Sequence, residues 1–400
     1  MADFEPNPRS EPTLISGTRE SYDLNTSRVV IDMEDRIHFI QPEATPFLTM
    51  SGKVKGKRLV KNVKYEWMEK DRKPRRVLIL GVETDVATAI ELVSGDGSKV
   101  AVNDLLQNTR TGELMLVTAN GGADDLTVTR GIGGVGVATV ANDECVILGS
   151  SYPDNSLKGT QISVQEDAKF NYVQIFRTPF DFTGRDLVTE LYGQDDKMTE
   201  TKWHAMEHKK SIEYTLMYGK RHLIAAAGGV KTRTFTGGLD ASVVTNAWDV
   251  TGMDVTKDSF DDFLEEALRW GPGGTYFGAG KKVFLCSSKW ITKINSFVNN
   301  QLQYFVLDKQ IGFRAMKYVS AHGDLTLLRS PLLDEFHSDR AYVIDFNLID
   351  YVTLRKRDTR LLSGREENDR DGEAYEFMTD CGLLLKEEFA HAKVFGLGLS

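Results

Sequence analysis

Three glycines have the G-x-G-x-x-G spacing of a dinucleotide-binding turn: Gly131, Gly133 and Gly136 in the stretch TRGIGGVGVAT. In such a site the glycines end a strand and open a helix, whose amide groups bind a pyrophosphate. Here the segment before the next apolar run, CVILG, is too short for a crossover helix. We therefore predict a glycine-rich turn between two strands and no bound cofactor.

The stretch HAMEH, which begins at His204, matches the H-x-x-E-H pattern of one class of zinc peptidase. On a helix this spacing places His204 and His208 on one face beside Glu207, as a zinc ion and a general base require. Lys209 and Lys210 follow directly and would repel a dication, and no motif for a third ligand is visible downstream. A charged helix face is the preferred interpretation, and a zinc metallopeptidase is kept as an alternative.

Two further features fall short of a catalytic signature. The stretch GPGGTYFGAGKK resembles a phosphate-binding loop, but Thr275 replaces its first glycine and Lys282 replaces the hydroxyl residue that binds Mg²⁺. The three cysteines are Cys145, Cys286 and Cys381. They are too few and too scattered for a disulfide framework or a cysteine zinc site. We expect no metal site and no enzyme.

The composition sets broad limits on the protein class. A chain of 400 residues, 41% of them hydrophobic, can bury a large core. Its net charge of -9 argues against a dedicated basic nucleic-acid binder. The first residues are polar and proline-rich, which predicts an extended arm and no signal peptide. No apolar run is long enough for a membrane span.

A basic segment stands out in this acidic chain, because residues 53–76 contain 11 Lys or Arg. Within it Val63, Tyr65 and Trp67 alternate with polar residues, which predicts a strand with two different faces. Three interpretations stay open: a solvated hairpin, a surface for single-stranded nucleic acid, and an arm that lies across the acidic surface of an identical neighbour. DSFDDFLEE and REENDRDGE are acidic segments that such an arm could contact.

The elements that would position these residues follow from the apolar pattern. Short runs such as GELMLVT and DLTVT alternate with turn sequences such as SGDG and NGGADD, and a second strand pattern begins at Asn171. This order predicts a small β-domain inserted in a long hairpin. A helix is expected over residues 197–227, with Gly228 and Gly229 as its stop, and an amphipathic helix is expected from Ser259 as its N-cap. The last two apolar segments, AYVIDFNLIDYVTLR and EAYEFMTDCGLLLKEEFAHAKVFGL, predict strands.

In their order, these segments resemble the major capsid proteins of tailed bacteriophages, which share the HK97 fold. The similarity is to the branch with a β-domain inserted in the extended loop. The stretches that carry it are PEATPFLTM, KYEWMEKD, GELMLVTANGGADDLTVTRGIGG, NYVQIFRTPFDFTG, EHKKSIEYTLMYGKR and TDCGLLLKEEFAHAKVFGL. The resemblance implies an α+β, HK97-like capsid fold.

The resemblance also implies how the chain divides. The expected parts are an N-terminal arm (1–28), a peripheral-domain segment (29–51), an extended loop (52–80 and 166–184), an inserted β-domain (81–165), a peripheral domain with a long spine helix (185–235 and 345–400) and an axial domain (236–344).

The function implied by the resemblance is structural. The chain would self-assemble into hexamers and pentamers that close an icosahedral shell around phage DNA, in the virion after assembly in the host cytoplasm. Scaffolding, portal and decoration proteins would be partners, DNA would be held without sequence-specific binding, and no membrane would be involved. An encapsulin-like nanocompartment shell is the main alternative. The expected inter-subunit contact residues are Lys64, Glu66, Trp67, Arg72, Lys73, Arg75 and Arg76.

Overall fold

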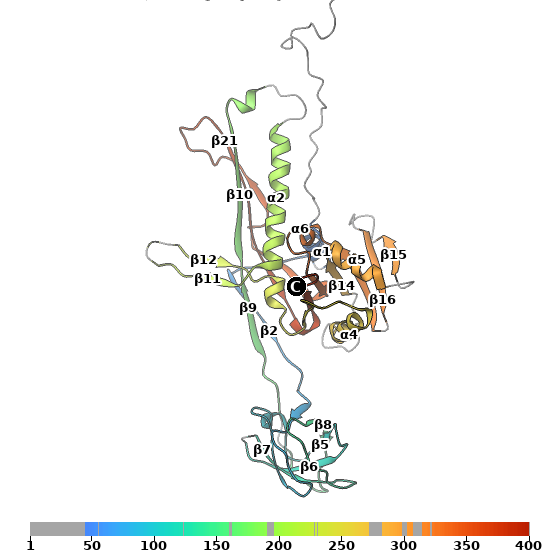
Figure 1. Ribbon diagram of the computed structural model, residues 1–400. Helices are drawn as coiled ribbons and strands as arrows, with labels where there is room; N and C mark the ends of the chain where they lie inside the picture. Colours follow the sequence, from blue (N-terminus) through green and yellow to red (C-terminus); the bar gives the residue numbers. More distant parts are fainter. Residues whose placement is uncertain are drawn as a thin grey trace, which may run out of the picture.

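The computed structural model describes residues 45–399, apart from 55, 123, 160–161, 190–195, 228, 230, 272–281, 298–301, 307–313 and 321. The predicted N-terminal arm, residues 1–28, lies outside the described residues. Figure 1 shows an elongated molecule, with a long sheet and helix, a second domain to one side, and a small β-domain at the end of a narrow stalk. No helix within the described ranges is long and apolar enough to cross a membrane.

A five-stranded sheet forms the long axis of the molecule. Its longest strand, β21, pairs antiparallel with every residue of β10. The strands are β1 (Lys57–Val60), β19 (Ile349–Leu354), β20 (Arg360–Leu362), β21 (Gly372–Leu385) and β10 (Gln174–Thr183). The helices α1 (Pro46–Val54) and α2 (Asp196–Tyr218) pack against this sheet through a shared apolar core. The short helices η4 (Asp186–Val188) and η6 (Phe346–Leu348) lie at its margins.

The first turn of α1 is held by a buried carboxyl group of α2. Glu213 is fully buried, and its Oε2 atom accepts a hydrogen bond from the backbone N–H of Leu48 at 3.2 Å. Carboxylates are stabilised at this end of a helix, where backbone N–H groups have no partner within the helix. Burial nevertheless raises the pKa of Glu213 to about 8. The packing of α1 on α2 therefore depends on an unusual titratable group.

The long helix is shorter than its sequence pattern predicts. α2 ends at Tyr218, whereas a helix was expected over residues 197–227. Gly219 follows, where an added Cβ atom would lie 2.6 Å from the backbone oxygen of Thr236, so only glycine fits this close approach. The chain then forms β11 (His222–Ile224), which pairs with β12 (Arg233–Phe235). The prediction beyond residue 218 was wrong, because the chain leaves the helix at Gly219 and residues 222–224 pair with β12 instead.

The second domain is built on a seven-stranded mixed sheet. In sheet order its strands are β13 (Ala247–Asp249), β22 (Ala392–Phe395), β18 (Ala341–Ile344), β14 (Lys282–Cys286), β17 (Gly323–Arg329), β16 (Arg314–Ser320) and β15 (Leu302–Val306). Its helices are α3 (Leu239–Ser242), α4 (Lys257–Leu268), α5 (Ser288–Phe297) and α6 (Pro331–Phe336), and η7 (Glu388–Ala390) precedes β22.

The helix α4 confirms the apolar stripe predicted from the sequence but not its N-cap. The five buried residues are Phe260, Phe263, Leu264, Ala267 and Leu268. The N-cap is Thr256, and Ser259 is the third helical residue, where it completes a reciprocal capping box with Thr256. Because both hydroxyl residues bind backbone N–H groups, the start of α4 is firmly fixed.

The stalk is a two-stranded hairpin that carries the inserted β-domain. β2 (Lys64–Glu69) pairs antiparallel with β9 (Asp167–Tyr172). The domain at its end is a six-stranded antiparallel sheet with its own apolar core. Its strands are β3 (Arg76–Leu78), β8 (Glu144–Ser150), β5 (Asp104–Asn108), β6 (Leu114–Asn120), β7 (Asp125–Thr129) and β4 (Ala89–Glu91), with the short helix η3 (Gly97–Lys99) between β4 and β5. The predicted β-domain within a long hairpin is thus present (Figure 1).

The sheets divide the chain differently from the predicted domain boundaries at three places. β3 begins the inserted sheet before residue 81, because it pairs with β8. β10, expected in the extended loop, pairs with β21 in the long sheet. β22, expected in the peripheral domain, pairs with β13 and β18, because its buried Ala392 and Val394 complete the core of the second domain. The division itself remains a prediction.

Candidate inter-subunit contact surface

The glycine motif forms a turn, as the sequence predicts. It follows β7 and precedes β8 within an antiparallel sheet, and Gly131 and Gly133 have positive φ angles of 64° and 73°. A buried ion pair fixes the turn: the Arg130 Nη2 atom lies 2.6 Å from Glu113 Oε2, and Glu113 also accepts the N–H groups of Gly131 and Val137. The motif therefore shapes the inserted domain.

The two histidines of HAMEH lie in α2 but do not form a metal site. The ring nitrogens of His208 lie 2.9 Å from the Thr178 hydroxyl and 2.8 Å from the Thr379 hydroxyl, so both are occupied. Burial also lowers the pKa of His208, which keeps the ring neutral. His204 stacks on Phe180, with ring centroids 4.6 Å apart. Within the described residues, no group of three or more His, Cys, Asp or Glu side chains could hold a metal.

Lys282, at the end of the phosphate-loop-like stretch, and the three cysteines are buried in the fold. Most of the loop that resembles a phosphate-binding loop, residues 272–281, lies outside the described residues. Lys282 is fully buried and donates hydrogen bonds to the carbonyl oxygens of Ala267 and Ala390, both at 2.6 Å. All three cysteines are free and buried. Burial raises the pKa of each thiol, so none is an activated nucleophile.

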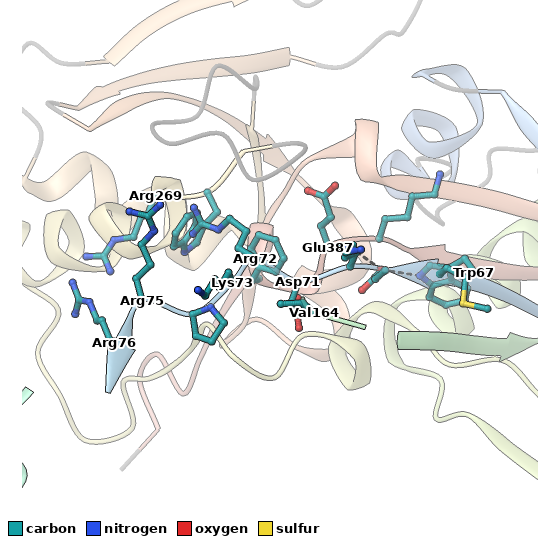
Figure 2. A pocket seen from close by; sticks show the side chains of 16 residues that line it. Trp67, Asp71, Arg72, Lys73, Arg75, Arg76, Val164, Arg269 and Glu387 are labelled. Carbon is teal, nitrogen blue, oxygen red and sulfur yellow. Dashed lines mark hydrogen bonds between the residues drawn. The ribbon is translucent and has the colours of Figure 1, made fainter. Parts of the chain in front are cut away.

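A cleft of about 1610 Å³ lies where the stalk meets the second domain. It is lined by residues 67–76 and Val164, which run from the stalk to the inserted domain, by Arg269 and Trp270 at the end of α4, and by Lys386, Glu387 and Phe389 after β21. Figure 2 shows the cationic side chains of Lys73, Arg75, Arg76 and Arg269 gathered at one end and Trp67 with Glu387 at the other. The cleft thus joins three parts of the fold.

Stacked and hydrogen-bonded groups hold the cleft walls together. The Arg72 guanidinium lies 3.7 Å from the centroid of the Trp270 ring, a cation–π contact across the cleft. At the other end of the cleft, Glu69 Oε1 accepts hydrogen bonds from the Trp67 indole at 2.7 Å and from the Glu387 backbone at 3.0 Å. These contacts connect the stalk to the end of α4 and to the segment that follows β21.

The cleft carries an excess of positive charge. Its lining contains seven Lys or Arg and three carboxylates. Several cations have partners, such as Arg76 with Glu144 at 2.8 Å. Lys73 and Arg75 are exposed and have no ion pair with any residue that the structure describes. Two exposed cations are therefore available for a partner outside the chain.

Five of the seven expected contact residues line the cleft, and their role as contacts between subunits remains a prediction. Of the seven expected contact residues, only Lys64 and Glu66 lie outside the cleft lining. They pair with each other on the exposed stalk, with Nζ and Oε1 2.5 Å apart. Arg269 and Trp270 gave no signal, because they are distant in sequence from the stalk and the contact depends on the tertiary fold.

Residues 15–398 match the family model described as SU10 major capsid protein. The chain belongs to this family. The resemblance to phage major capsid proteins is therefore confirmed, and the α+β HK97-like fold that it implied agrees with the architecture described above. Membership of a capsid protein family indicates a structural role.

Individual relatives of this SU10-family chain are distant. It is 24% identical to the major capsid protein of Pseudomonas phage PaMx41 over 189 residues, which are 46% of this chain and 44% of that protein. The chain thus matches less than half the length of this curated relative.

Solved structures with similar chains include capsids and an encapsulin. The capsid of the native GTA particle has 11% identity and a TM-score of 0.48, covering 92% of this chain and 96% of that one. Mycobacterium phage Bobi has 7% identity and a TM-score of 0.49, covering 94% and 97%. The holo-SrpI encapsulin complex from Synechococcus elongatus has 11% identity and a TM-score of 0.42, covering 58% and 78%.

Proposed function

We propose that this chain is the major capsid protein of a phage head, which self-assembles into hexamers and pentamers and forms an icosahedral shell around DNA. The observation that carries the proposal is the family match over residues 15–398. The shape supports it, because a rigid body with a projecting stalk and inserted domain can contact neighbours at a distance (Figure 1). The proposed location is the virion, after assembly in the host cytoplasm.

We further propose that the segment from Lys64 in β2 to Arg76 at the start of β3 forms an inter-subunit contact. The residues with this role are Lys64, Glu66, Trp67, Arg72, Lys73, Arg75 and Arg76. Exposed cations such as Lys73 and Arg75, without ion pairs among the described residues, would pair with carboxylates of a neighbouring copy. Because exposed charges are screened by salt, such a contact weakens as ionic strength rises.

The proposed partners beyond the chain itself are scaffolding, portal and decoration proteins, with DNA held inside without sequence-specific binding. The alternative is an encapsulin-like nanocompartment shell, which encloses proteins. The contents of shells purified from a phage-infected host separate the two. Encapsidated DNA supports the phage head, and shells filled with a protein cargo and free of nucleic acid contradict it.

Charge reversal tests the contact. The triple variant Arg72→Glu, Arg75→Glu, Arg76→Glu should remain folded by circular dichroism but fail to form particles in negative-stain electron microscopy. A control that reverses Lys158 and Lys231, two exposed lysines outside the cleft, should assemble normally. Intact shells from the triple variant would refute the contact.

A further inference from the structure

We propose that the basic cleft binds the exposed acidic face of α4 on a second copy of this chain. The inference rests on the proposed function, since it names the partner of the proposed inter-subunit contact. It starts from Lys73 and Arg75, which are exposed, line the cleft and have no ion pair with any described residue. A partner surface must therefore offer carboxylates that are also unpaired and that are held at a matching spacing.

The acidic face of α4 meets the first requirement. The helix contains five carboxylates and one lysine, whereas the cleft lining has an excess of four cations. Asp258, Asp262 and Glu266 are exposed and have no ion pair within the described part of the chain. The same helix is fixed by its capping box and by its buried apolar stripe, so these carboxylates are held in place.

The spacing of the two sets of charges also matches. Asp258, Asp262 and Glu266 repeat every four residues, which on an α-helix places successive carboxylates about 6 Å apart along one face. Lys73 and Arg75 are alternate residues around Pro74, which disfavours a helical conformation of Lys73. In an extended chain alternate side chains repeat about every 7 Å on the same side. Two cations can therefore face two carboxylates at once.

The other acidic segment fits less well. The loop between β20 and β21, residues 363–371, contains four carboxylates and two arginines. Arg370 pairs with Asp181, and Glu366 accepts the N–H of Ala374 at 3.2 Å. The contact with Ala374 engages one of the four carboxylates, and the loop does not hold them at the regular spacing of a helix.

The two surfaces make a head-to-tail contact. The cleft lies at the C-terminal end of α4, where Arg269 pairs with Glu265 of the same chain at 3.2 Å. Asp258 and Asp262 lie in the first half of the helix, away from the end that carries Arg269 and Trp270, so the acidic face extends beyond the cleft of its own chain. A contact between different patches is heterologous, and it generates a closed ring when the rotation between copies closes. This is the arrangement that a hexamer or pentamer needs.

Charge exchange in the full-length chain tests the pairing. Lys73→Glu/Arg75→Glu and Asp262→Lys/Glu266→Lys should each raise the protein concentration needed for half-assembly by about ten-fold or more. Asp258 is left unchanged because it lies in the first turn of α4, where a carboxylate favours the helix. The four-fold variant should recover assembly, since the charges are opposite again. Unchanged thermal unfolding shows that each variant remains folded.

The possible results separate the inference from the proposed function. Recovery in the four-fold variant supports the pairing. If both double variants impair assembly without recovery, α4 is not the partner, and the proposed shell contact at the cleft stands. If Glu366→Lys/Glu367→Lys restores the Lys73→Glu/Arg75→Glu variant instead, the loop 363–371 is the occupant and the inference is overturned. If neither double variant affects assembly, the cleft contact itself is refuted.

Discussion

Replacing Arg130 by Met should strongly destabilise the inserted β-domain, because Arg130 is one partner of a buried ion pair. The Arg130 and Glu113 side chains are 5% and 1% exposed, and two hydrogen bonds join them, from Nε at 2.9 Å and from Nη2 at 2.6 Å. Removing one partner of a buried pair leaves an uncompensated charge and costs about 3–5 kcal/mol. In the variant, Glu113 still accepts hydrogen bonds from the N–H groups of Gly131 and Val137. The expected loss of stability is therefore near the lower end of this range.

Protonation of Glu113 gives this prediction a pH signature. Burial acts to raise the pKa of Glu113, but hydrogen bonds from Arg130 and from backbone N–H groups lower it below the ordinary value. A carboxyl group with a lowered folded-state pKa stabilises the fold above its unfolded pKa, and this stability is lost as the pH falls. In Arg130→Met the pKa of Glu113 is no longer lowered by the Arg130 side chain. Acid should therefore destabilise the variant less than the natural chain.

Native-state hydrogen exchange of β5, β6 and β7 measures the free energy of opening of the inserted domain directly. The matched control is Arg76→Met, which removes an exposed partner of Glu144 and should cost less than about 1 kcal/mol. The double variant Arg130→Met/Glu113→Gln should be more stable than Arg130→Met, since no unpaired charge remains. If Arg130→Met costs no more than the control, the reasoning about the buried pair is wrong.

Three further predictions concern other parts of the chain. Because burial raises the pKa of Glu213 to about 8, the folded state holds its proton longer than the unfolded state, and stability should fall as pH rises from about 4.5 towards 8. Thermal unfolding of Glu213→Gln should lack this decline, and an unchanged decline would exclude Glu213 as its source. Gly136→Ala should destabilise the inserted domain by roughly 1–3 kcal/mol in hydrogen exchange, because a Cβ atom there would lie 2.2 Å from the backbone oxygen of Asp85. Gly134→Ala, which meets nothing within 4 Å, is the control, and equal effects would contradict the account. Elemental analysis should find no stoichiometric zinc, since both ring nitrogens of His208 are engaged; one zinc per chain, lost in His208→Ala, would support the peptidase alternative.

The sequence was most informative where structure is local. Turn residues and short apolar runs predicted the inserted β-domain, and the absence of room for a helix after Gly136 identified the glycine motif as a turn. The apolar stripe of α4 was also predictable from its period. Long-range pairing was not, because β22 joins β13 across more than a hundred residues and nothing in either strand specifies the other.

The candidate site was only half predictable for the same reason. The basic segment marks one wall of the cleft in the sequence itself. The other wall comes from Trp270 and Phe389, which meet edge-on with ring centroids 6.0 Å apart only after the second domain folds. The end of α2 at Tyr218 is a further case, since residues 222–224, within the helical pattern, pair with β12 instead.

The central claim is that this chain assembles into a shell through charged contacts. The most direct measurement is sedimentation velocity of the purified full-length chain at low and high salt, with negative-stain electron microscopy of each fraction. The account predicts hexameric and pentameric capsomers or closed shells at low salt, and a shift towards smaller species at high salt. A strictly monomeric species of 44.8 kDa under every condition, including after addition of a phage-infected host extract, would contradict it.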